Sequence, residues 1–464
     1  MSTRQLFAKD ALLPTGWAQN IHLTWNDEGV IESVFTGVDA KAINTLSVPH
    51  AKGPLLPGMP NLHSHAFQRG FAGLTEFKNQ SQDSFWSWRT QMYQFALQIS
   101  PAQMLAIAKF LYIEMLQAGY TSVCEFHYLH HDTDGKAYAN AATMAQCLLQ
   151  AAQETGIHIT LLPVLYQHSG FDGQAPLKEQ KRFLHSNKAM QKLLEQLNPI
   201  CQAQDAVLGV APHSLRAVTL ESLKEALDGL HSLNTAAPIH IHIAEQMAEV
   251  NACLAWSGKR PVELLLHHFE LNSKWCLVHA THLSPSEIKQ LATSQAVAGI
   301  CPSTECNLGD GIFNMPAWLE HDGVWGIGSD SHVCVNAAEE LMLLEYSQRL
   351  HLQQRNVIKN QQQPDVASAM MLAAVKGGAQ ASGRNINGLA VGQSADFVVL
   401  DAEHFATACL PQAPQQLASH IFASHRSNAI ESVWVKGHRL VHNGQHSFAQ
   451  NAKEQFIQVR QALC

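Results

Sequence analysis

The chain has no long apolar run, and no stretch approaches the roughly 18 to 20 residues that a helix needs to cross a bilayer. Its N-terminal segment has no apolar core of the kind that defines a signal peptide. Positive charge is also scarce, with 30 Lys and Arg against 38 Asp and Glu, so no basic patch for nucleic acid is indicated. We therefore expect a cytoplasmic chain that binds neither membranes nor nucleic acid.

The ten cysteines show no paired spacing, and most lie in apolar stretches such as those around Cys276 and Cys301. Reduced thiols in a cytoplasmic protein are the simpler interpretation. The chain has no GxGxxG after an early strand and no repeat at solenoid spacing. These absences disfavour a disulfide scaffold, a dinucleotide-binding sheet and a repeat protein.

What the chain has is a globular composition, with 46% hydrophobic and 15% charged residues over 464 positions. This length suits one large domain and a smaller one. The unusual feature is the 27 histidines. Most of them must be solvated or hydrogen-bonded in the core, so the question is which few lie where chemistry can use them.

The two ends of the chain resemble each other in pattern. Short strands separated by turn residues are predicted at 21–25, 30–37 and 45–49, and again between about 389 and 445. We expect both ends to form one small β-sandwich domain, split by a long insertion. The predicted boundaries are 1–56, 57–388 and 389–464, the last including a tail.

The middle of the chain alternates short apolar strands with helical stretches. Residues 101–119 have helical apolar spacing, with a proline near the start and a glycine at the end. Near-continuous apolar runs suit parallel strands that are covered on both faces. Eight such units predict an α/β fold, a (β/α)₈ TIM-like barrel. A doubly wound sheet is the alternative, although its usual fingerprint is missing.

In such a barrel the active site forms where the strands end, so the polar residues at those ends are informative. The first barrel strand ends in His63-Ser-His65. Residues two apart on a strand share a side, so both imidazoles can face one metal. An isolated HxH is weak evidence, and two ordinary polar loop residues remain the alternative.

The fifth strand ends in His240-Ile-His242-Ile-Ala-Glu245. His242 lies nearer the barrel mouth and is the preferred ligand, whereas His240 is interpreted as a core or supporting histidine. Glu245 follows where the chain leaves the strand. A carboxylate there can lie beside a metal without binding it, as a proton shuttle requires.

Strand six ends in His279, and strand eight ends in Gly-Ile-Gly-Ser-Asp330. An ionised carboxylate is costly to bury unpaired, so Asp330 makes better sense as a metal ligand than as a core residue. Three imidazoles and one carboxylate match the N and O ligands of catalytic zinc, which keeps a position for water. His282 follows in the loop and is interpreted as surface polarity.

The motifs PGMPNLHSH, HIHIAE, LVHATH and GIGSD resemble the mononuclear deaminase branch of the amidohydrolase superfamily, over about residues 50–440. The resemblance implies one zinc ion per chain, held by His63, His65, His242 and Asp330. No lysine at the end of strand four is a convincing bridging ligand, which favours one metal over two. The ending NGLAVGQSADFVVLD looks like the superfamily's return into its small β domain.

A closer resemblance is to the formimidoylglutamate deiminases, through segments such as HSHAFQRGFAGL, APHSLRAV and CPSTECNLGDGIF. It implies hydrolysis of N-formimino-L-glutamate to N-formyl-L-glutamate and ammonia in histidine degradation, by a homodimer. Gln68, Tyr128, His213 and Arg216 would then bind the substrate's carboxylates. The alternatives for these residues are a surface ion pair for Arg216, a packed strand aromatic for Tyr128 and a polar residue at a helix start for Gln68.

The expected mechanism uses Glu245, His279 and Asp330 as catalytic residues. Asp330 takes a proton from a water molecule acidified by the metal, His279 holds that water, and Glu245 protonates the imino nitrogen and then the departing ammonia. We assign no chemistry to His127, His130 and His131. The segment of Cys301, Cys306 and Asn307 is interpreted as pocket wall.

Three alternatives remain. A deaminase of guanine or a related heterocycle would share the metal site but would not require Arg216 together with His213 and Tyr128. Imidazolonepropionase is a ring-opening relative from the same pathway. A catalytically inactive binding scaffold belongs to another class, and such scaffolds usually lose metal ligands that are all present in this chain.

Overall fold

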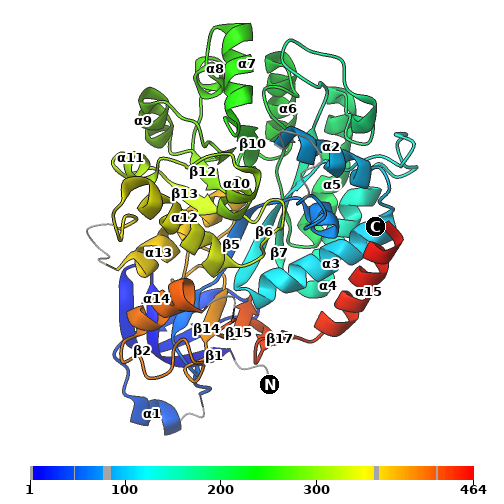
Figure 1. Cartoon of the computed structure of the whole chain (residues 1–464). Coiled ribbons are helices and arrows are strands. Elements are labelled where there is room, and N and C mark those ends of the chain that lie inside the picture. Colours follow the sequence, from blue (N-terminus) through cyan, green and yellow to red (C-terminus); the bar gives the residue numbers. More distant parts are fainter. Residues whose placement is uncertain (1–3, 46–47, 77–84, 360–364, 425–426, 464) are drawn as a thin grey trace.

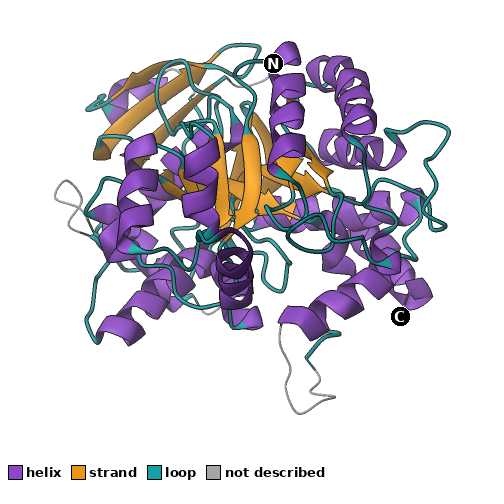
Figure 2. Cartoon of the chain, turned by 90° about the horizontal axis from the view of Figure 1, so that it is seen from above, coloured by secondary structure: helices purple, strands orange, loops and turns teal. Residues whose placement is uncertain are grey.

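The computed structural model describes residues 4–45, 48–76, 85–359, 365–424 and 427–463. Its centre is a ring of parallel strands surrounded by helices (Figure 2), and a second sheet built from both chain ends lies beside it (Figure 1). The predicted barrel and its accompanying β domain are therefore both present.

The barrel is assembled from two parallel sheets. The first contains β5 (Met59–Ser64), β6 (Tyr120–His127), β7 (His158–Leu165) and β8 (Val207–Leu208), with β9 (Ala211–Pro212) also paired to β7. The second contains β10 (Ile239–Ile243), β11 (Trp275–His279), β12 (Val297–Ile300) and β13 (Trp325–Ile327). Parallel bridges Ser64–Asp330 and Val210–Ile239 join the two sheets into a closed ring.

The fourth barrel position is divided into two short strands. β8 and β9 are separated by Gly209 and Val210, and both pair with β7. A Cβ on Gly209 would lie 2.4 Å from the carbonyl oxygen of Pro238, so only glycine permits this close approach. Counting β8 and β9 as one position gives the eight predicted units.

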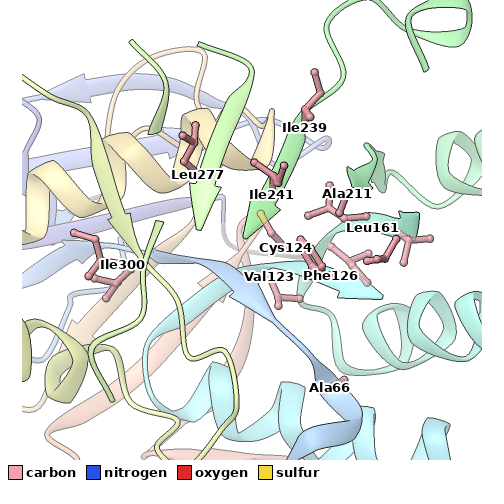
Figure 3. Packing of buried hydrophobic residues seen from close by; sticks show 14 of the residues in the cluster. Ala66, Val123, Cys124, Phe126, Leu161, Ala211, Ile239, Ile241, Leu277 and Ile300 are labelled. Carbon is pink, nitrogen blue, oxygen red and sulfur yellow. The ribbon is translucent and has the colours of Figure 1, made fainter. Parts of the chain in front are cut away.

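Apolar side chains fill the interior of the ring. Every residue of β5, β6, β7, β10 and β11 is buried, as parallel strands covered by helices require. Figure 3 shows Cys124, Phe126, Leu161, Ala211 and Ile241 gathered between neighbouring strands. This core anchors the strand ends from which the polar residues project.

Several helices begin at a local capping signal. The predicted helix at 101–119 is α3 (Pro101–Gln117), which Ser100 and Gln103 cap reciprocally. The others are α1 (Ala40–Thr45), η1 (Ala66–Phe71), α2 (Phe85–Ala96), α4 (Thr143–Thr155), η2 (Lys178–Gln180), α5 (Asn187–Ala203), α6 (Leu220–Leu233), α7 (Met247–Ser257), α8 (Pro261–His268), α9 (Pro285–Ser294), α10 (Pro302–Leu308), α11 (Met315–Leu319), α12 (Ala337–Leu352), α13 (Val366–Ser382), α14 (Ala413–Ala423) and α15 (Ala449–Leu463).

The chain ends form one continuous eight-stranded sheet in the order β17-β16-β15-β14-β4-β1-β2-β3. Its strands are β1 (Gln5–Leu13), β2 (Gly16–Trp25), β3 (Ile31–Phe35), β4 (Leu55–Pro57), β14 (Phe397–Leu400), β15 (Ile430–Val435), β16 (His438–His442) and β17 (Gln445–His446). Trp25 on β2 contacts Phe397 on β14 at 5.7 Å between ring centroids, although two strands separate them in the sheet. The sheet therefore curls around its own core.

Several elements differ from the sequence expectation. Strand β1 was not predicted, and the predicted strand at 45–49 includes residues 46–47, which lie outside the described residues. The expected tail contains α15, which packs on α3 through stacked Phe456 and Phe110 rings 4.2 Å apart. The domain boundaries stay predictions, and the change of sheet between Pro57 and Met59 supports the first of them.

The nine cysteines of the described ranges are all free. Across the same ranges, no helix has both the length and the apolar character needed to cross a membrane.

Candidate active site at the barrel mouth

Four buried side chains from three strand ends converge at the mouth of the barrel. His63 Nε2 lies 3.1 Å from His65 Nε2 and 3.0 Å from His242 Nε2. Asp330 Oδ1 lies 3.3 Å from both His63 Nε2 and His65 Nε2. We refer to His63, His65, His242 and Asp330 as the metal group, because these four are also the predicted ligands.

Hydrogen bonds on the far side of two rings determine which nitrogen faces the centre of the metal group. His65 Nδ1 donates to Phe126 O at 2.8 Å, and His242 Nδ1 donates to His213 O at 3.1 Å. A neutral imidazole that donates through Nδ1 presents a lone pair at Nε2. Lone pairs therefore point at one another, an arrangement that a cation stabilises.

Electrostatics keep these donors ready for a cation. Burial lowers the pKa of His63 to about 3, and burial likewise lowers the pKa values of His65 and His242. Burial alone would raise the pKa of Asp330, but hydrogen bonding to His63 and electrostatic interaction with His63, His279 and His65 bring it below its ordinary value. Neutral imidazoles and an ionised carboxylate are the protonation states that a divalent metal requires.

The local backbone makes this convergence possible. A Cβ on Gly328 would lie 2.7 Å from the Cβ of His63, so glycine allows strand eight to approach strand one closely. His279 and Asp330 have φ values of 66° and 45°, in the left-handed region that non-glycine residues rarely adopt. These turns at the strand ends direct both side chains into the mouth.

The two other predicted catalytic residues lie beside the metal group. His279 Nε2 is 3.7 Å from Asp330 Oδ2 and 3.6 Å from Glu245 Oε1. Burial opposes a charge on His279, but the carboxylates of Glu245, Glu305 and Asp330 raise its pKa to about 10. Burial raises the pKa of Glu245 to about 7, which suits a group that exchanges protons near neutral pH.

The predicted substrate-binding residues line the same cavity as the metal group. Gln68 Nε2 donates to Tyr128 OH at 2.8 Å, and the side-chain oxygen Oε1 of Gln68 is buried without a partner. The His213 ring lies 4.9 Å from that of His242, and Tyr128 lies 4.9 Å from His65. Tyr128 and His213 therefore border the metal group directly, and Gln68 is held beside it through Tyr128.

Two half-buried arginines, Arg89 and Arg216, line the same cavity and have no direct contact with the metal group among the contacts of the described residues. We call these two arginines and Trp86, whose ring lies beside both, the outer wall. The guanidinium carbons of Arg89 and Arg216 lie 4.3 Å and 5.5 Å from the Trp86 ring centroid. Arg89 Nη1 and Arg216 Nε and Nη1 are buried without a hydrogen-bond partner. Neither arginine has a carboxylate within ion-pair distance in the described parts of the chain.

Arg89 is the main residue that sequence reasoning missed. It lies on α2, whose segment FWSWRTQMYQFA was not predicted as a helix. A usable signal was present, because Trp86 and Tyr93 stand three residues before and four after Arg89, on one helical face. The guanidinium lies over both rings, at 4.3 Å and 5.6 Å.

A polar network behind the metal group was also missed. Ser64, between the two first histidines, donates to Glu125 at 2.6 Å and contacts His332 Nε2 at 3.1 Å. His332 Nδ1 lies 3.0 Å from Ser329 Oγ, so the network connects strands one, two and eight. It fixes the register of the strands that carry the metal group.

The remaining interpretations have mixed outcomes. His240 Nε2 bonds to Ala381 O at 2.8 Å and takes no part in the metal group, as expected of a core histidine. His282 bonds to Asp310 O at 2.8 Å and is half-buried, so surface polarity was wrong for it. The pocket-wall interpretation was wrong for Cys306 and Asn307, because Cys306 is exposed and Asn307 donates to Glu76 at 2.8 Å on the surface.

The family of the chain follows from comparison with known proteins. The model of the Amidohydrolase family matches residues 55–440, and the model described as Formimidoylglutamate deiminase HutF, N-terminal domain, matches residues 3–46. The formimidoylglutamate deiminase of Pseudomonas aeruginosa is 45% identical over 456 residues, covering 98% of each chain.

Solved structures agree with this assignment. An amidohydrolase from Brucella melitensis superposes with a TM-score of 0.93 at 46% identity, covering 99% of each chain. An adenosine deaminase from Xanthomonas campestris with bound zinc has a TM-score of 0.77 at 20% identity, covers 98% of each chain, and shows likeness of fold. The chain belongs to the amidohydrolase family, within the group that includes the formimidoylglutamate deiminase of Pseudomonas aeruginosa.

Proposed function

We propose that the protein is a zinc-dependent enzyme that hydrolyses N-formimino-L-glutamate to N-formyl-L-glutamate and ammonia, a step of histidine degradation. The observation that carries this proposal is the outer wall. Two half-buried guanidinium groups, which have no carboxylate within ion-pair distance among the described residues, line the same cavity as His65, His242 and Asp330 of the metal group. Unpaired buried charge is costly, so the cavity favours a substrate that brings negative charge to that end.

The metal group fits zinc by the chemistry of its donors. Three neutral imidazole nitrogens and one carboxylate oxygen are typical zinc ligands, and the four atoms lie close enough to share one ion. A divalent ion bound there would act as a Lewis acid that lowers the pKa of a water molecule toward neutrality. We assign His63, His65, His242 and Asp330 as its ligands.

The catalytic residues have separate roles around the reacting carbon. Asp330 Oδ2 and His279 Nε2, 3.7 Å apart, orient the attacking water, and Asp330 accepts its proton. His279, whose pKa the surrounding carboxylates raise against the effect of burial, stabilises the negative charge that develops during attack. Glu245 protonates the imino nitrogen, takes up the hydroxyl proton of the tetrahedral intermediate, and passes it to the amino group, which leaves as ammonia. The proton that Asp330 accepted from water then restores the protonated Glu245.

The order of groups along the cavity matches the order of groups in the substrate. The α-carboxylate is the nearer one to the formimino group, and Tyr128 and His213, with Gln68 bonded to Tyr128, border the metal group. The side-chain carboxylate is farther from the formimino group, and Arg89 and Arg216 line the cavity without a direct contact to the metal group among the described residues. We therefore assign the neutral donors to the α-carboxylate and the arginine pair to the side-chain carboxylate, which the guanidinium groups can bind as bidentate partners.

The alternatives explain less of the cavity. Guanine is neutral and would leave both arginines of the outer wall unpaired. An inactive scaffold would not need four converging ligands with Glu245 and His279 beside them. A homodimer and a cytoplasmic location remain our predictions for the state and place in which the enzyme works.

A substrate panel tests the proposal. The zinc-loaded protein should release ammonia from N-formimino-L-glutamate at least about 100-fold more efficiently than from N-formimino-glycine, which lacks the side-chain carboxylate. N-formimino-L-aspartate keeps both charges but shortens their spacing by one methylene, and should fall between them. Efficient deamination of guanine with no action on N-formimino-L-glutamate would refute the substrate and leave the deaminase chemistry intact.

A further inference from the structure

A second set of metal-binding side chains lies beside the metal group. One ligand atom each from Glu245, His279 and Asp310 lies within 4.8 Å of the others, and all three residues are buried. The contact between the first two joins Glu245 Oε1 and His279 Nε2 at 3.6 Å. Asp310 has no part in the proposed reaction, so its presence in this set calls for a separate explanation.

Asp310 is a buried carboxylate with an unused oxygen. The residue is 5% exposed, and its Oδ1 accepts a hydrogen bond from Gln246 Nε2. Its Oδ2 is buried without a partner, and no Lys, Arg or His of the described ranges forms an ion pair with it. A carboxylate in this state is costly to keep ionised unless a cation approaches.

The His279 ring is also oriented for a ligand. Its Nδ1 lies 3.3 Å from Glu305 Oε1, which in turn accepts from Cys301 N at 2.9 Å. Because the neighbouring carboxylates favour a protonated ring, a metal ion must displace the Nε2 proton. The ring that still donates through Nδ1 to Glu305 then presents its Nε2 lone pair toward Glu245. One imidazole nitrogen and two carboxylate oxygens are a donor set that suits zinc and similar divalent metals.

The surrounding charge favours a cation. Burial raises the pKa of Asp310 to about 9, and the carboxylates of Glu245, Glu305 and Asp330 add to the increase while His279 opposes it. The repulsion among these carboxylates is relieved either by a proton or by a metal ion. A metal must displace that proton, so this set should bind more weakly than the metal group.

We propose that Glu245, His279 and Asp310 form a second, inhibitory divalent-cation site, which zinc occupies only when it exceeds one equivalent per chain. Occupancy engages the carboxylate of Glu245 and the Nε2 of His279, which the proposed reaction needs for proton transfer and for orienting water. The inhibition therefore rests on the proposed function, whereas the site itself rests on the geometry of the three side chains.

The experiment measures zinc stoichiometry on the protein that already holds one equivalent. Equilibrium dialysis against rising free Zn²⁺ should show a second equivalent in the wild type, and ammonia release should fall as it binds. Asp310→Asn should stay at one equivalent, with the same activity in excess zinc as at one equivalent. Asp310→Ser is a second variant with the same expectation, and Asp322→Asn, at an exposed aspartate, should behave like the wild type.

The outcomes separate this site from the proposed function. A wild type that never exceeds one equivalent, or an Asp310→Asn protein that still takes up the second, would overturn the inference. Loss of the first equivalent in Asp310→Asn would also overturn it, because the two sites would not be separate. A protein that binds the second equivalent through Asp310 but hydrolyses no formimino compound would support the site and refute the proposed function.

Discussion

The metal group and the outer wall lie in one cavity but are built in different ways. The metal group comes from the ends of barrel strands, where alternation and a closed ring fix each side chain. The outer wall comes from α2 and from the segment after β9, which the barrel pattern does not determine. On the proposed function, reaction chemistry is fixed by the scaffold, whereas substrate choice resides in segments added to it.

The largest expected effect separates two histidines of the same strand. His242→Ala removes a ligand of the metal group, so zinc affinity should fall by more than about 100-fold and activity with it. His240→Ala is the matched control, because His240 is also buried on β10 but bonds to Ala381 O. Elemental analysis of both proteins checks this, and equal zinc in the two would remove His242 from the ligand set.

The next effect separates chemistry from metal binding. Glu245→Gln should lower kcat by about 10²- to 10⁴-fold while leaving one zinc per chain, because the amide cannot deliver a proton. Kinetics and metal content measured on the same preparation provide the test. If zinc were lost as well, Glu245 would be a ligand of the first ion and its role as proton donor would be wrong.

Removing an arginine of the outer wall should change substrate preference and leave the zinc content unchanged. Arg89→Met and Arg216→Met should each lower kcat/KM for N-formimino-L-glutamate by about 100-fold, because a desolvated charge loses its partner. Turnover of N-formimino-glycine should change much less. Arg439→Met is a matched control, since Arg439 also lies over an aromatic ring, 5.7 Å from that of Trp434, but is exposed and away from the cavity. Equal losses for both substrates would contradict the assignment of the arginines to the side-chain carboxylate.

The smallest effect concerns the pH dependence of folding stability, through a cluster of buried histidines that begins next to Tyr128. His127, which precedes Tyr128, contacts His130 at 5.0 Å between ring centroids, and His130 contacts His185 at 4.3 Å. Burial lowers the pKa values of His127 and His185 to about 3. In the unfolded chain these groups bind protons near pH 6.5, so the unfolded state holds more protons between about pH 6.5 and 3.

Their contribution to stability is therefore complete above about pH 6.5 and is lost as the pH falls toward 3. Within that window, each of these histidines should make the free energy of unfolding fall by about 1.4 kcal/mol for each pH unit of acidification. Urea unfolding of His127→Gln should show a weaker loss of stability between neutral pH and about pH 5 than the wild type. The exposed His438→Gln should leave the wild-type dependence unchanged, and the same slope in all three proteins would exclude a role for His127.

The sequence alone was sufficient to select the four residues of the metal group, because few arrangements of strands satisfy their pattern. Strand periodicity places His63 and His65 on one side, and a buried Asp330 needs a cation in any fold. Only one arginine of the outer wall was predicted from the sequence. Arg216 follows a barrel strand, whereas Arg89 lies on an inserted helix. Asp310 gave no signal, since only the folded chain shows that its second oxygen lacks a partner.

Titration of the metal-free protein with zinc tests the central claim most directly, with ammonia release from N-formimino-L-glutamate as the signal. The account predicts no activity without metal, a rise in proportion to bound zinc, and a maximum at one equivalent per chain. Activity in the metal-free protein, or a maximum reached only at two equivalents, would contradict a single catalytic ion held by His63, His65, His242 and Asp330.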